Sequence, residues 1–381
     1  MLHDCPEISN AEKESVWAAY RAGRPTRVPV SIASNPRVVL LNPSLNADGL
    51  TFQRVFDDPG SMMEAALQHE RYRRTVIHRY CDSPTGLPEA WAAGVSWLNC
   101  HEAVFFGASL HFREGQIPDT EPFLAEGDRE RIFRVDITRP LETGIYRKGL
   151  DFQARMCELA EGREFHGRPI RVARYAPTGT DGPLTSALNL RGAQFLEEMA
   201  TDRDYAERLL DFLTDATILR TEAVRKHWGD ERIGAGFADD SVQLISPAMY
   251  REIVLPRHRR FYERFYPDQA RSIHLCGDVM RHMKALVGDL NVRSFDTGFP
   301  VDFAWVRREL GPEVEIKGGP GIAVLLNGRP QEVYDATCRV LESGIMAGGR
   351  FMLTEANNLP PCVPEENLAA MYRAALDKGV Y

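Results

Sequence analysis

The sequence predicts an α/β fold, and within that class a (β/α)8 barrel of TIM type that carries an N-terminal extension. Strand-like and helix-like stretches alternate from about residue 91 to the end of the chain, and such alternation is typical of a parallel sheet. No predicted strand is followed by a glycine-rich dinucleotide motif, which disfavours an open nicotinamide-binding sheet. We therefore expect an extension over residues 1–90 that packs on a barrel spanning residues 91–381.

The composition is that of an ordinary globular protein, since 44% of the residues are hydrophobic and 26% are charged. The net charge of -8 disfavours nucleic acid or an anionic membrane as the main partner. No apolar stretch has the length of a transmembrane helix, and the acidic stretch from Met1 to Ser15 differs from a secretory or transit signal. The seven scattered cysteines favour free thiols in a reducing compartment. We therefore expect a cytoplasmic enzyme with a small-molecule substrate, and its oligomeric state stays open.

The first quarter of the chain is predicted to contain strand and helix without regular alternation. Residues 10–22 are predicted to be helical, and residues 58–80 have the pattern of one amphipathic helix. Residues 27–32 are predicted to form a short strand, and Pro29 confines that strand to a sheet edge or a strand start. This lack of alternation is why we treat the segment as an extension.

The barrel is predicted to begin with a strand near residue 97. Six further strands are expected near residues 172, 235, 274, 294, 315 and 351. An eighth strand, which would close the barrel, is expected at 108–112 or at 132–137. The helices between and after these strands are expected at about 185–199, 202–228, 278–287, 302–310, 331–344 and 365–378.

Polar side chains gather where the predicted strands end. In α/β barrels, residues on the carboxyl ends of the strands tend to be catalytic. Each acid taken alone has a simpler explanation as a turn former or helix cap. Their occurrence together favours one shared site, which would collect Asp239, Asp240, His274, Cys276, Asp278, Asp296, Glu355, Asn357 and Cys362.

His274 and Cys276 stand two positions apart on one predicted strand, so their side chains point to the same face. An imidazole nitrogen and a thiolate are ligands that zinc prefers, although a pair of buried core residues would have the same pattern. A zinc site needs a third and usually a fourth ligand, and the candidates are Asp296, Glu355 and Cys362. Cys100 and His101 are adjacent and would face opposite ways, which disfavours a second site there.

The order and spacing of several motifs in the second half of the chain resemble those of the uroporphyrinogen decarboxylase superfamily. That group includes haem-pathway decarboxylases and zinc-dependent, corrinoid-linked methyltransferases that act on thiols, and its fold is an α/β barrel. The resemblance covers about residues 170–381, and more loosely 91–120. The matching motifs are Gly182–Thr185, Asp239–Asp240, Leu244–Tyr250, His274–Asp278, Lys317–Gly319, Gly348–Arg350 and the loop from Asn357 to Pro364.

The chain departs from true uroporphyrinogen decarboxylases at the positions that would hold their substrate. Their N-terminal arginine pair is not kept, and only Arg37 stands in the nearest loop. By the resemblance, their pyrrole-binding aspartate falls near Asn99, their tyrosine near Asn189 and their late histidine at Asn357. An asparagine lacks the negative charge that pyrrole N–H donors require. We therefore expect a reaction other than decarboxylation of a porphyrinogen, whose many carboxylates would need several basic contacts.

The methyltransferase branch is more similar, because its His-x-Cys motif matches His274 and Cys276. The resemblance implies a zinc ion that lowers the pKa of a bound thiol and presents a thiolate to a methyl group. The later cysteine of that branch falls near Asn357, with Glu355 just before it and Cys362 a few residues after it. The resemblance thus implies two of the three zinc ligands, His274 and Cys276. At the position of the third ligand, this chain has Asn357 in place of a cysteine.

The leading hypothesis is zinc-dependent methyl transfer to or from a small molecule in a thiol- or corrinoid-linked system. The chain has no cobalamin-binding motif of its own, so a corrinoid would arrive on a partner protein. The expected roles are acid–base or orienting for Asp239, Asp240, Asp296 and Asn357; substrate binding for Arg37, Asn99 and Asn189; and metal binding for His274, Cys276, Glu355 and Cys362.

Two alternatives stay open at this point. One is a metal-free decarboxylase or lyase that acts on a smaller carboxylate, with Asp240 or Asp296 as its acid. The other is a non-catalytic partner of a corrinoid protein within a larger demethylase.

Overall fold

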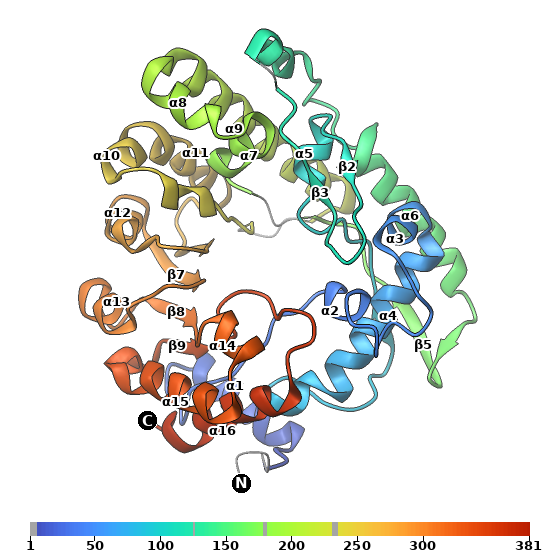
Figure 1. The fold of residues 1–381 in the computed structure, drawn as a ribbon, viewed down its shortest axis with the longest axis vertical. Helices are drawn as coiled ribbons and strands as arrows, with labels where there is room; N and C mark the ends of the chain where they lie inside the picture. The colour runs from blue at the N-terminus through green and yellow to red at the C-terminus, as the bar shows by residue number, and fades with distance from the viewer. Residues whose placement is uncertain (1–5, 125, 178–180, 231–234) are drawn as a thin grey trace.

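The computed structural model describes residues 6–124, 126–177, 181–230 and 235–381. Its elements form a ring with strands toward the middle and helices outside (Figure 1). The largest sheet is parallel and has the order β6-β7-β8-β9. These strands confirm the ones predicted near 274, 294, 315 and 351, and their bounds are Arg271–Leu275, Val292–Thr297, Glu315–Gly318 and Phe351–Leu353.

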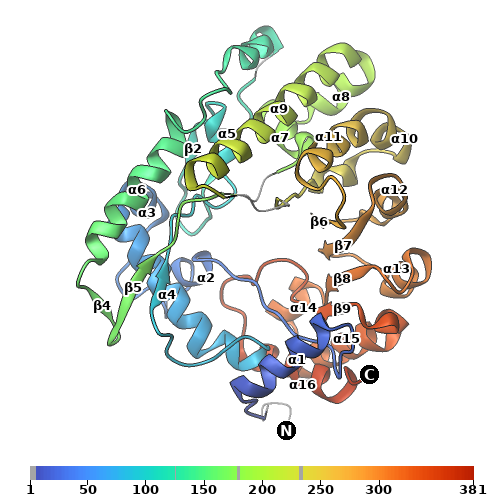
Figure 2. The same ribbon diagram turned by 180° about the vertical axis from the view of Figure 1, so that it is seen from behind.

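Most of the helices that follow these strands pack outside the sheet, as regular alternation requires. Figure 2 shows α12 and α13 on the outer side of the strands and α15 and α16 beyond β9, whereas α14 lies toward the middle of the ring. Their bounds are α12 Met280–Leu290, α13 Phe303–Leu310, α14 Ile322–Asn327, α15 Pro330–Val340 and α16 Glu365–Lys378. The last helix has the bounds that the sequence pattern predicts.

Isolated bridges extend this parallel layer at both edges. Val30 bridges Leu353 of β9, Ala238 bridges His274 of β6, and Asp181 bridges Ala238, each in parallel. A further parallel pair joins β1 (Trp91–Ala93) to β5 (Arg168–Val172), with β4 (Glu164–Phe165) antiparallel to β5. The strand predicted near 172 is confirmed. For the strand predicted near 235, the structure describes residues 235–238, while residues 233 and 234 lie outside the described part.

The predictions for the first and the eighth strand were wrong in position. The strand placed near residue 97 lies earlier, at β1, and Leu98 has a φ of 51° that no strand accommodates. Residues 110–111 form β2, which pairs antiparallel with β3 (Asp119–Thr120), and residues 126–134 form a 3-10 helix, η2. The segment beside β9 is instead residues 29–31, since the Ser31 amide donates to the Leu353 carbonyl at 3.0 Å. Part of the predicted extension therefore belongs to the parallel layer.

The N-terminal helices follow local capping signals. The first, α1 (Asn10–Arg21), has a capping box between Ser9 and Glu12, and α4 (Pro59–Thr75) starts at a capping Asp58. The single helix predicted over 58–80 ends at Thr75 and continues as the 3-10 helix η1 (Ile77–Tyr80). Between α1 and α4 lie two short helices, α2 (Arg37–Leu40) and α3 (Phe52–Asp57).

The middle of the chain is helical. The helix predicted over 185–199 is split at Gly192 into two, while the one predicted over 202–228 is confirmed and capped by Asp202. The bounds are α5 His101–Phe105, α6 Gly144–Ala160, α7 Pro183–Arg191, α8 Gln194–Thr201, α9 Arg203–Trp228, η3 Asp240–Leu244, α10 Pro247–Met249, η4 Tyr250–Val254 and α11 Leu255–Phe265. Near the C-terminus lie the short π-helix η5 (Leu341–Ile345) and the 3-10 helix η6 (Ala347–Gly349).

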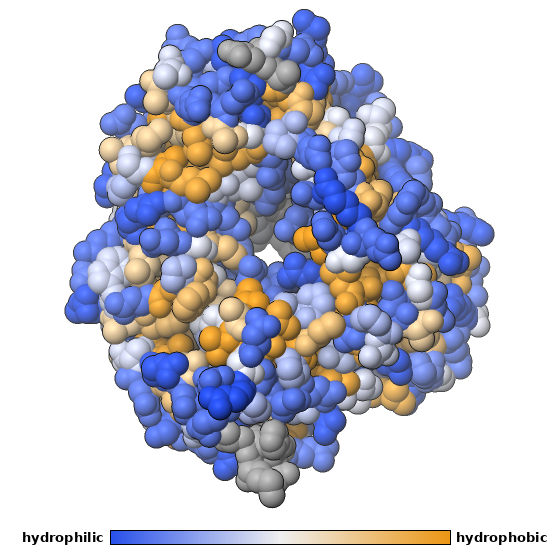
Figure 3. Space-filling model, viewed as in Figure 1, coloured by the Kyte–Doolittle hydropathy of each residue, from blue (hydrophilic) through white to orange (hydrophobic). Residues whose placement is uncertain are grey.

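The surface is largely hydrophilic on the face shown in Figure 3, with hydrophobic residues gathered around the hollow at its centre. One large cluster of buried apolar side chains joins the strands to the surrounding helices. Among the described residues, no helix is both long enough and apolar enough to cross a bilayer.

A buried ion pair ties the N-terminal segment to the last helix. Arg27 donates to both carboxylate oxygens of Asp82, at 2.8 and 2.5 Å. The same carboxylate accepts from the Val30 amide and from the Tyr372 hydroxyl of α16, each at 2.7 Å. Because the Asp82 side chain is completely buried, its charge depends on these partners.

We expect Arg27→Met to lower the free energy of unfolding by about 3 kcal/mol, since it leaves a buried carboxylate without its cation. Arg21→Met is the matched control, because the Arg21–Glu14 pair is exposed and should contribute less than about 1 kcal/mol. Urea unfolding of both variants measures the difference, and equal losses would contradict an anchoring role for Arg27.

Candidate functional site

The site is built where β6 and β7 end side by side. His274 of β6 stands opposite Asp296 of β7 in the register of the two strands. The His274 ring contacts Asp296 through Nδ1, 2.9 Å from Oδ2, and Cys276 through Nε2, 3.1 Å from Sγ. The two-residue spacing therefore places His274 and Cys276 on one face, as predicted.

Asp240 completes this group from the first turn of η3. Its Oδ1 accepts a hydrogen bond from the Cys276 amide at 2.7 Å. One ligand atom each from Asp240, His274 and Cys276 lie within 4.8 Å of one another. Burial raises the pKa of the Asp240 carboxyl. Among the described residues, this is the group of three whose donor atoms are close enough to share a metal ion.

The electrostatics of the group favour a bound positive charge. Burial lowers the pKa of His274, but the hydrogen bonds to Asp296 and Cys276 outweigh it and raise the pKa to about 11. Metal ions and protons compete for the same nitrogen, sulfur and oxygen atoms. A divalent cation between these side chains would satisfy the same demand for positive charge.

Two glycines make room for the Cys276 turn. A Cβ on Gly298 would lie 2.8 Å from the Cys276 Cα and 3.0 Å from its Sγ. Gly277 has a φ of 81°, and a Cβ there would lie 2.0 Å from the Gln243 side chain. Gly298 was not anticipated from the sequence, although a glycine two residues after the predicted strand end at Asp296 is a signal for such close packing.

Asp239, predicted to act in acid–base chemistry, is fully buried behind the group and engaged within the protein. Its Oδ1 accepts from the Thr185 amide and hydroxyl, at 2.8 and 2.7 Å. Its Oδ2 contacts His258 Nε2 at 2.8 Å, and His258 Nδ1 in turn contacts the Tyr250 hydroxyl at 3.1 Å. This geometry favours a supporting role, in which Asp239 holds α7 and α11 to the strand end and positions Asp240.

A second buried cluster lies beside Asp239 and was not anticipated from the sequence. Glu102 pairs with Arg220 and accepts from the Asp181 amide at 2.6 Å. Burial raises the pKa of the Asp181 carboxyl well above its usual value, and the charges of Glu102, Asp239 and Asp240 add to the effect. The carboxyl groups of Glu102, Asp181, Asp239 and Asp240 are therefore close enough to affect one another.

Glu355 and Arg37 lie on the other side, where the N-terminal segment meets the loop after β9. Glu355 is fully buried, and burial raises the pKa of its carboxyl to about 8. Its Oε2 accepts from the Ala33 amide at 3.0 Å. Arg37 contacts the Asn358 carbonyl at 3.5 Å.

The remaining predicted residues do not join the three-residue group. Cys362 is exposed, and its Sγ lies 3.8 Å from the Leu41 carbonyl. Asn357 is half-buried in the bend after β9, Asn189 is half-buried on α7, and Asn99 is exposed.

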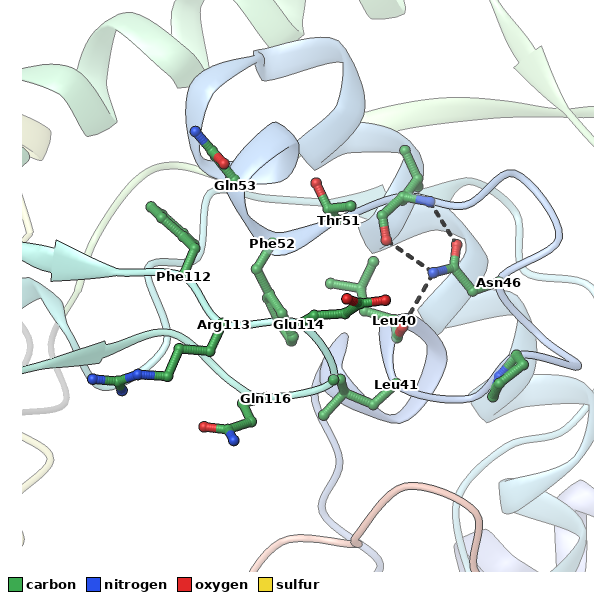
Figure 4. A pocket seen from close by; sticks show the side chains of 13 residues that line it. Leu40, Leu41, Asn46, Thr51, Phe52, Gln53, Phe112, Arg113, Glu114 and Gln116 are labelled. Carbon is green, nitrogen blue, oxygen red and sulfur yellow. Dashed lines mark hydrogen bonds between the residues drawn. The ribbon is translucent and has the colours of Figure 1, made fainter.

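A cavity of about 630 Å³ opens between the N-terminal segment and the β2–β3 hairpin. Figure 4 shows the apolar side chains of Leu40, Phe52 and Phe112 with the polar Glu114 and Gln116 around it. None of Asp240, His274, Cys276 and Asp296 is among the residues that line it.

Comparison with known proteins adds the following. The model of the uroporphyrinogen decarboxylase (URO-D) family matches residues 100–377. The methylcobamide:CoM methyltransferase MtbA of Methanosarcina mazei is 25% identical over 195 residues, which are 51% of this chain and 56% of that protein. The methylated-thiol–coenzyme M methyltransferase of the same organism is 28% identical over 201 residues, 52% of each chain. The uroporphyrinogen decarboxylase of Thermus thermophilus is 28% identical over 212 residues, 54% of this chain and 56% of that one.

The chain therefore spans about half the length of the curated relatives it matches. A solved methyltransferase structure from Methanosarcina mazei covers 97% of this chain and 99% of its own, with a TM-score of 0.63 and 18% identity. At that identity, the match shows a shared fold.

The buried Asp239–His258 contact generates a prediction about stability. We expect His258→Ala to lower the free energy of unfolding by about 3 kcal/mol, because Asp239 would keep its burial and lose a partner. In His111→Ala, the control, the histidine is partly exposed and 4.0 Å from Glu121, so a loss below about 1 kcal/mol is expected. Chemical denaturation gives both values, and a small loss in His258→Ala would show that Asp239 needs no such support.

Proposed function

Because this chain belongs to the uroporphyrinogen decarboxylase family, we propose that it is a zinc-dependent methyltransferase on a closed (β/α)8 barrel. The observation that carries the proposal is the convergence of Asp240, His274 and Cys276 within 4.8 Å at the strand ends. The methyltransferase relatives and the shared methyltransferase fold support it.

The donor set fits zinc, which takes nitrogen, sulfur and carboxylate oxygen ligands in four-coordinate sites. His274 Nε2, Cys276 Sγ and an Asp240 oxygen would hold the ion and leave one position for a substrate thiol. When bound, zinc supplies a Lewis acid that lowers the pKa of such a thiol. Asp296, through its contact with Nδ1, fixes the orientation of the His274 ring, as outer partners of metal-binding histidines do.

Methyl transfer to a thiol forms a carbon–sulfur bond, breaks the bond between the methyl carbon and its carrier, and releases the thiol proton. The Asp296 side chain is 43% exposed, so it offers that proton a path to solvent.

Asp240 takes the place of the third ligand, since Asn357 stands where the methyltransferase branch has its later cysteine. Cys362 lies at the surface, with no metal role in this proposal.

The methyl group would be delivered by a corrinoid on a partner protein. The relatives' names mention a methylcobamide and methylated thiols. Arg37, Asn99 and Asn189 remain proposed substrate contacts, and the charge of Glu355 acts on the Arg37 guanidinium. The expected cytoplasmic location remains a prediction.

A metal-free decarboxylase is the second candidate, favoured by the 28% identity to the Thermus thermophilus decarboxylase. The asparagines at positions 99, 189 and 357 argue against a porphyrinogen as the substrate, so this candidate would act on a smaller carboxylate. Release of carbon dioxide from small carboxylic acids that persists with a chelator would support this candidate, and would exclude zinc-dependent methyl transfer.

We expect the purified protein to bind about one zinc ion per chain. Cys276→Ser should weaken zinc binding about 100-fold or more, because it removes a thiolate ligand. Cys362→Ser, the matched control, should retain wild-type affinity, since Cys362 is exposed and is not part of the three-residue group. Competition with a chelating dye measures both constants. Loss of zinc in Cys362→Ser, or its retention in Cys276→Ser, would contradict the proposed ligand set.

The close packing of Gly298 gives an independent check. In Gly298→Ala the added methyl group must displace Cys276, so zinc affinity should fall about tenfold or more. Gly288→Ala on α12 is the control, because a Cβ there meets nothing within 4 Å. The same dye competition applies, and equal affinities in the two variants would argue that Cys276 is not a ligand.

A further inference from the structure

Asp240 enters the metal-binding group from a very short helix. It is the first residue of η3, a 3-10 helix of five residues. Such short helices have poor hydrogen-bond geometry and little stability of their own. The place of the Asp240 carboxylate beside His274 and Cys276 therefore depends on the contacts that hold η3 against the end of β6.

Arg281, in the first turn of α12, holds the far end of η3. Its Nε donates to the Ile245 carbonyl at 3.3 Å, and its Nη2 donates to the Gln243 carbonyl. Carbonyl groups at the end of a helix lack partners within that helix. Because the guanidinium carries several donors in one plane, a single side chain can satisfy both carbonyls.

The chain just before Arg281 contacts the near end of η3 as well. The Cys276 amide donates to Asp240 Oδ1 at 2.7 Å. A Cβ on Gly277 would lie 2.0 Å from the Gln243 side chain, so η3 rests directly on the turn after Cys276. Residues 276–281 therefore supply a proposed metal ligand and also hold both ends of the helix that supplies another.

Asp278, one of the acids predicted to join the site, orients the Arg281 side chain instead. Its Oδ2 lies 3.8 Å from Arg281 Nη1, which leaves Nε and Nη2 for the two carbonyls of η3. The Asp278 and Arg281 side chains are 61% and 38% exposed. An exposed pair of this kind contributes little to overall stability, so the role of Arg281 lies in the position of η3.

We propose that Arg281 is a positioning residue for the metal, which holds η3 so that the Asp240 carboxylate reaches the ion shared with His274 and Cys276. Arg281 does not touch the ion and acts through Asp240. Removal of its guanidinium should therefore change metal affinity through that one ligand. This inference rests on the proposed function, since it takes Asp240 as a zinc ligand.

The first test measures zinc affinity by competition with a chelating dye. Arg281→Met should weaken zinc binding about tenfold or more, as loss of an outer partner of a metal ligand commonly does. Arg281→Lys should weaken it less, because the ammonium group can still donate to one carbonyl. Arg251→Met is the matched control and should retain wild-type affinity, since Arg251 pairs with Asp289 near the other end of α12, at 3.4 Å.

A double variant shows whether Arg281 acts through Asp240. Asp240→Ala alone should weaken zinc binding, because it removes a ligand. If Arg281 only places that carboxylate, adding Arg281→Met to Asp240→Ala should change the affinity less than about twofold. A general structural role would give the full loss in both backgrounds. That result overturns the proposal, as does wild-type affinity in Arg281→Met.

Hydrogen exchange of the metal-free protein separates this inference from the proposed function. In Arg281→Met, the amides of residues 240–246 and of Cys276 should exchange about fivefold or more faster than in the wild type, and those of β7 should be unchanged. If the wild-type protein binds no zinc, the proposed function fails and exchange alone decides. Faster exchange over residues 240–246 then sustains the role of Arg281 in holding η3, and unchanged exchange rejects it.

Discussion

The register between β6 and β7 is the constraint on which the rest of the site depends. It sets His274 directly opposite Asp296, so that one ring nitrogen contacts the carboxylate and the other faces Cys276. A shift by one residue would turn these side chains to the other face of the sheet. Ile273 and Leu275 alternate with His274 along β6 and are buried, so their packing on the opposite face of the strand fixes that register. The chemistry of the site thus follows from how the sheet packs.

The surroundings hold this edge in place through buried polar contacts. Asp239 receives hydrogen bonds from α7 and contacts His258 of α11, and this fixes the strand end that leads into Asp240. On the far side, the N-terminal segment pairs with β9 and supplies the amide that binds Glu355. The N-terminal segment therefore does two things: it adds to the parallel layer and it forms one wall beside the site.

Much of the fold and part of the site could be predicted from the sequence. Alternating strands and helices from β6 to α16 have local patterns, and the His-x-Cys spacing gives a shared face without knowledge of the tertiary structure. The segment around Val30 could not be assigned in this way, because its partner Leu353 lies more than 300 residues away in the chain. Cys362 was a reasonable ligand candidate because it lies only a few residues after Asn357 in the sequence. In the structure, however, the loop after β9 places Cys362 at the surface. Asp240 was expected to be catalytic, and its place in the three-residue group depends on its contact with the Cys276 amide.

We propose that Asp240, His274 and Cys276 bind one zinc ion. Crystals of zinc-loaded protein, measured on both sides of the zinc absorption edge, test this proposal most directly. We expect a single strong anomalous peak about 2.0–2.3 Å from the His274 Nε2, the Cys276 Sγ and an Asp240 oxygen. A peak at Cys362 or elsewhere, or no peak at the ends of β6 and β7 in zinc-saturated crystals, would contradict it.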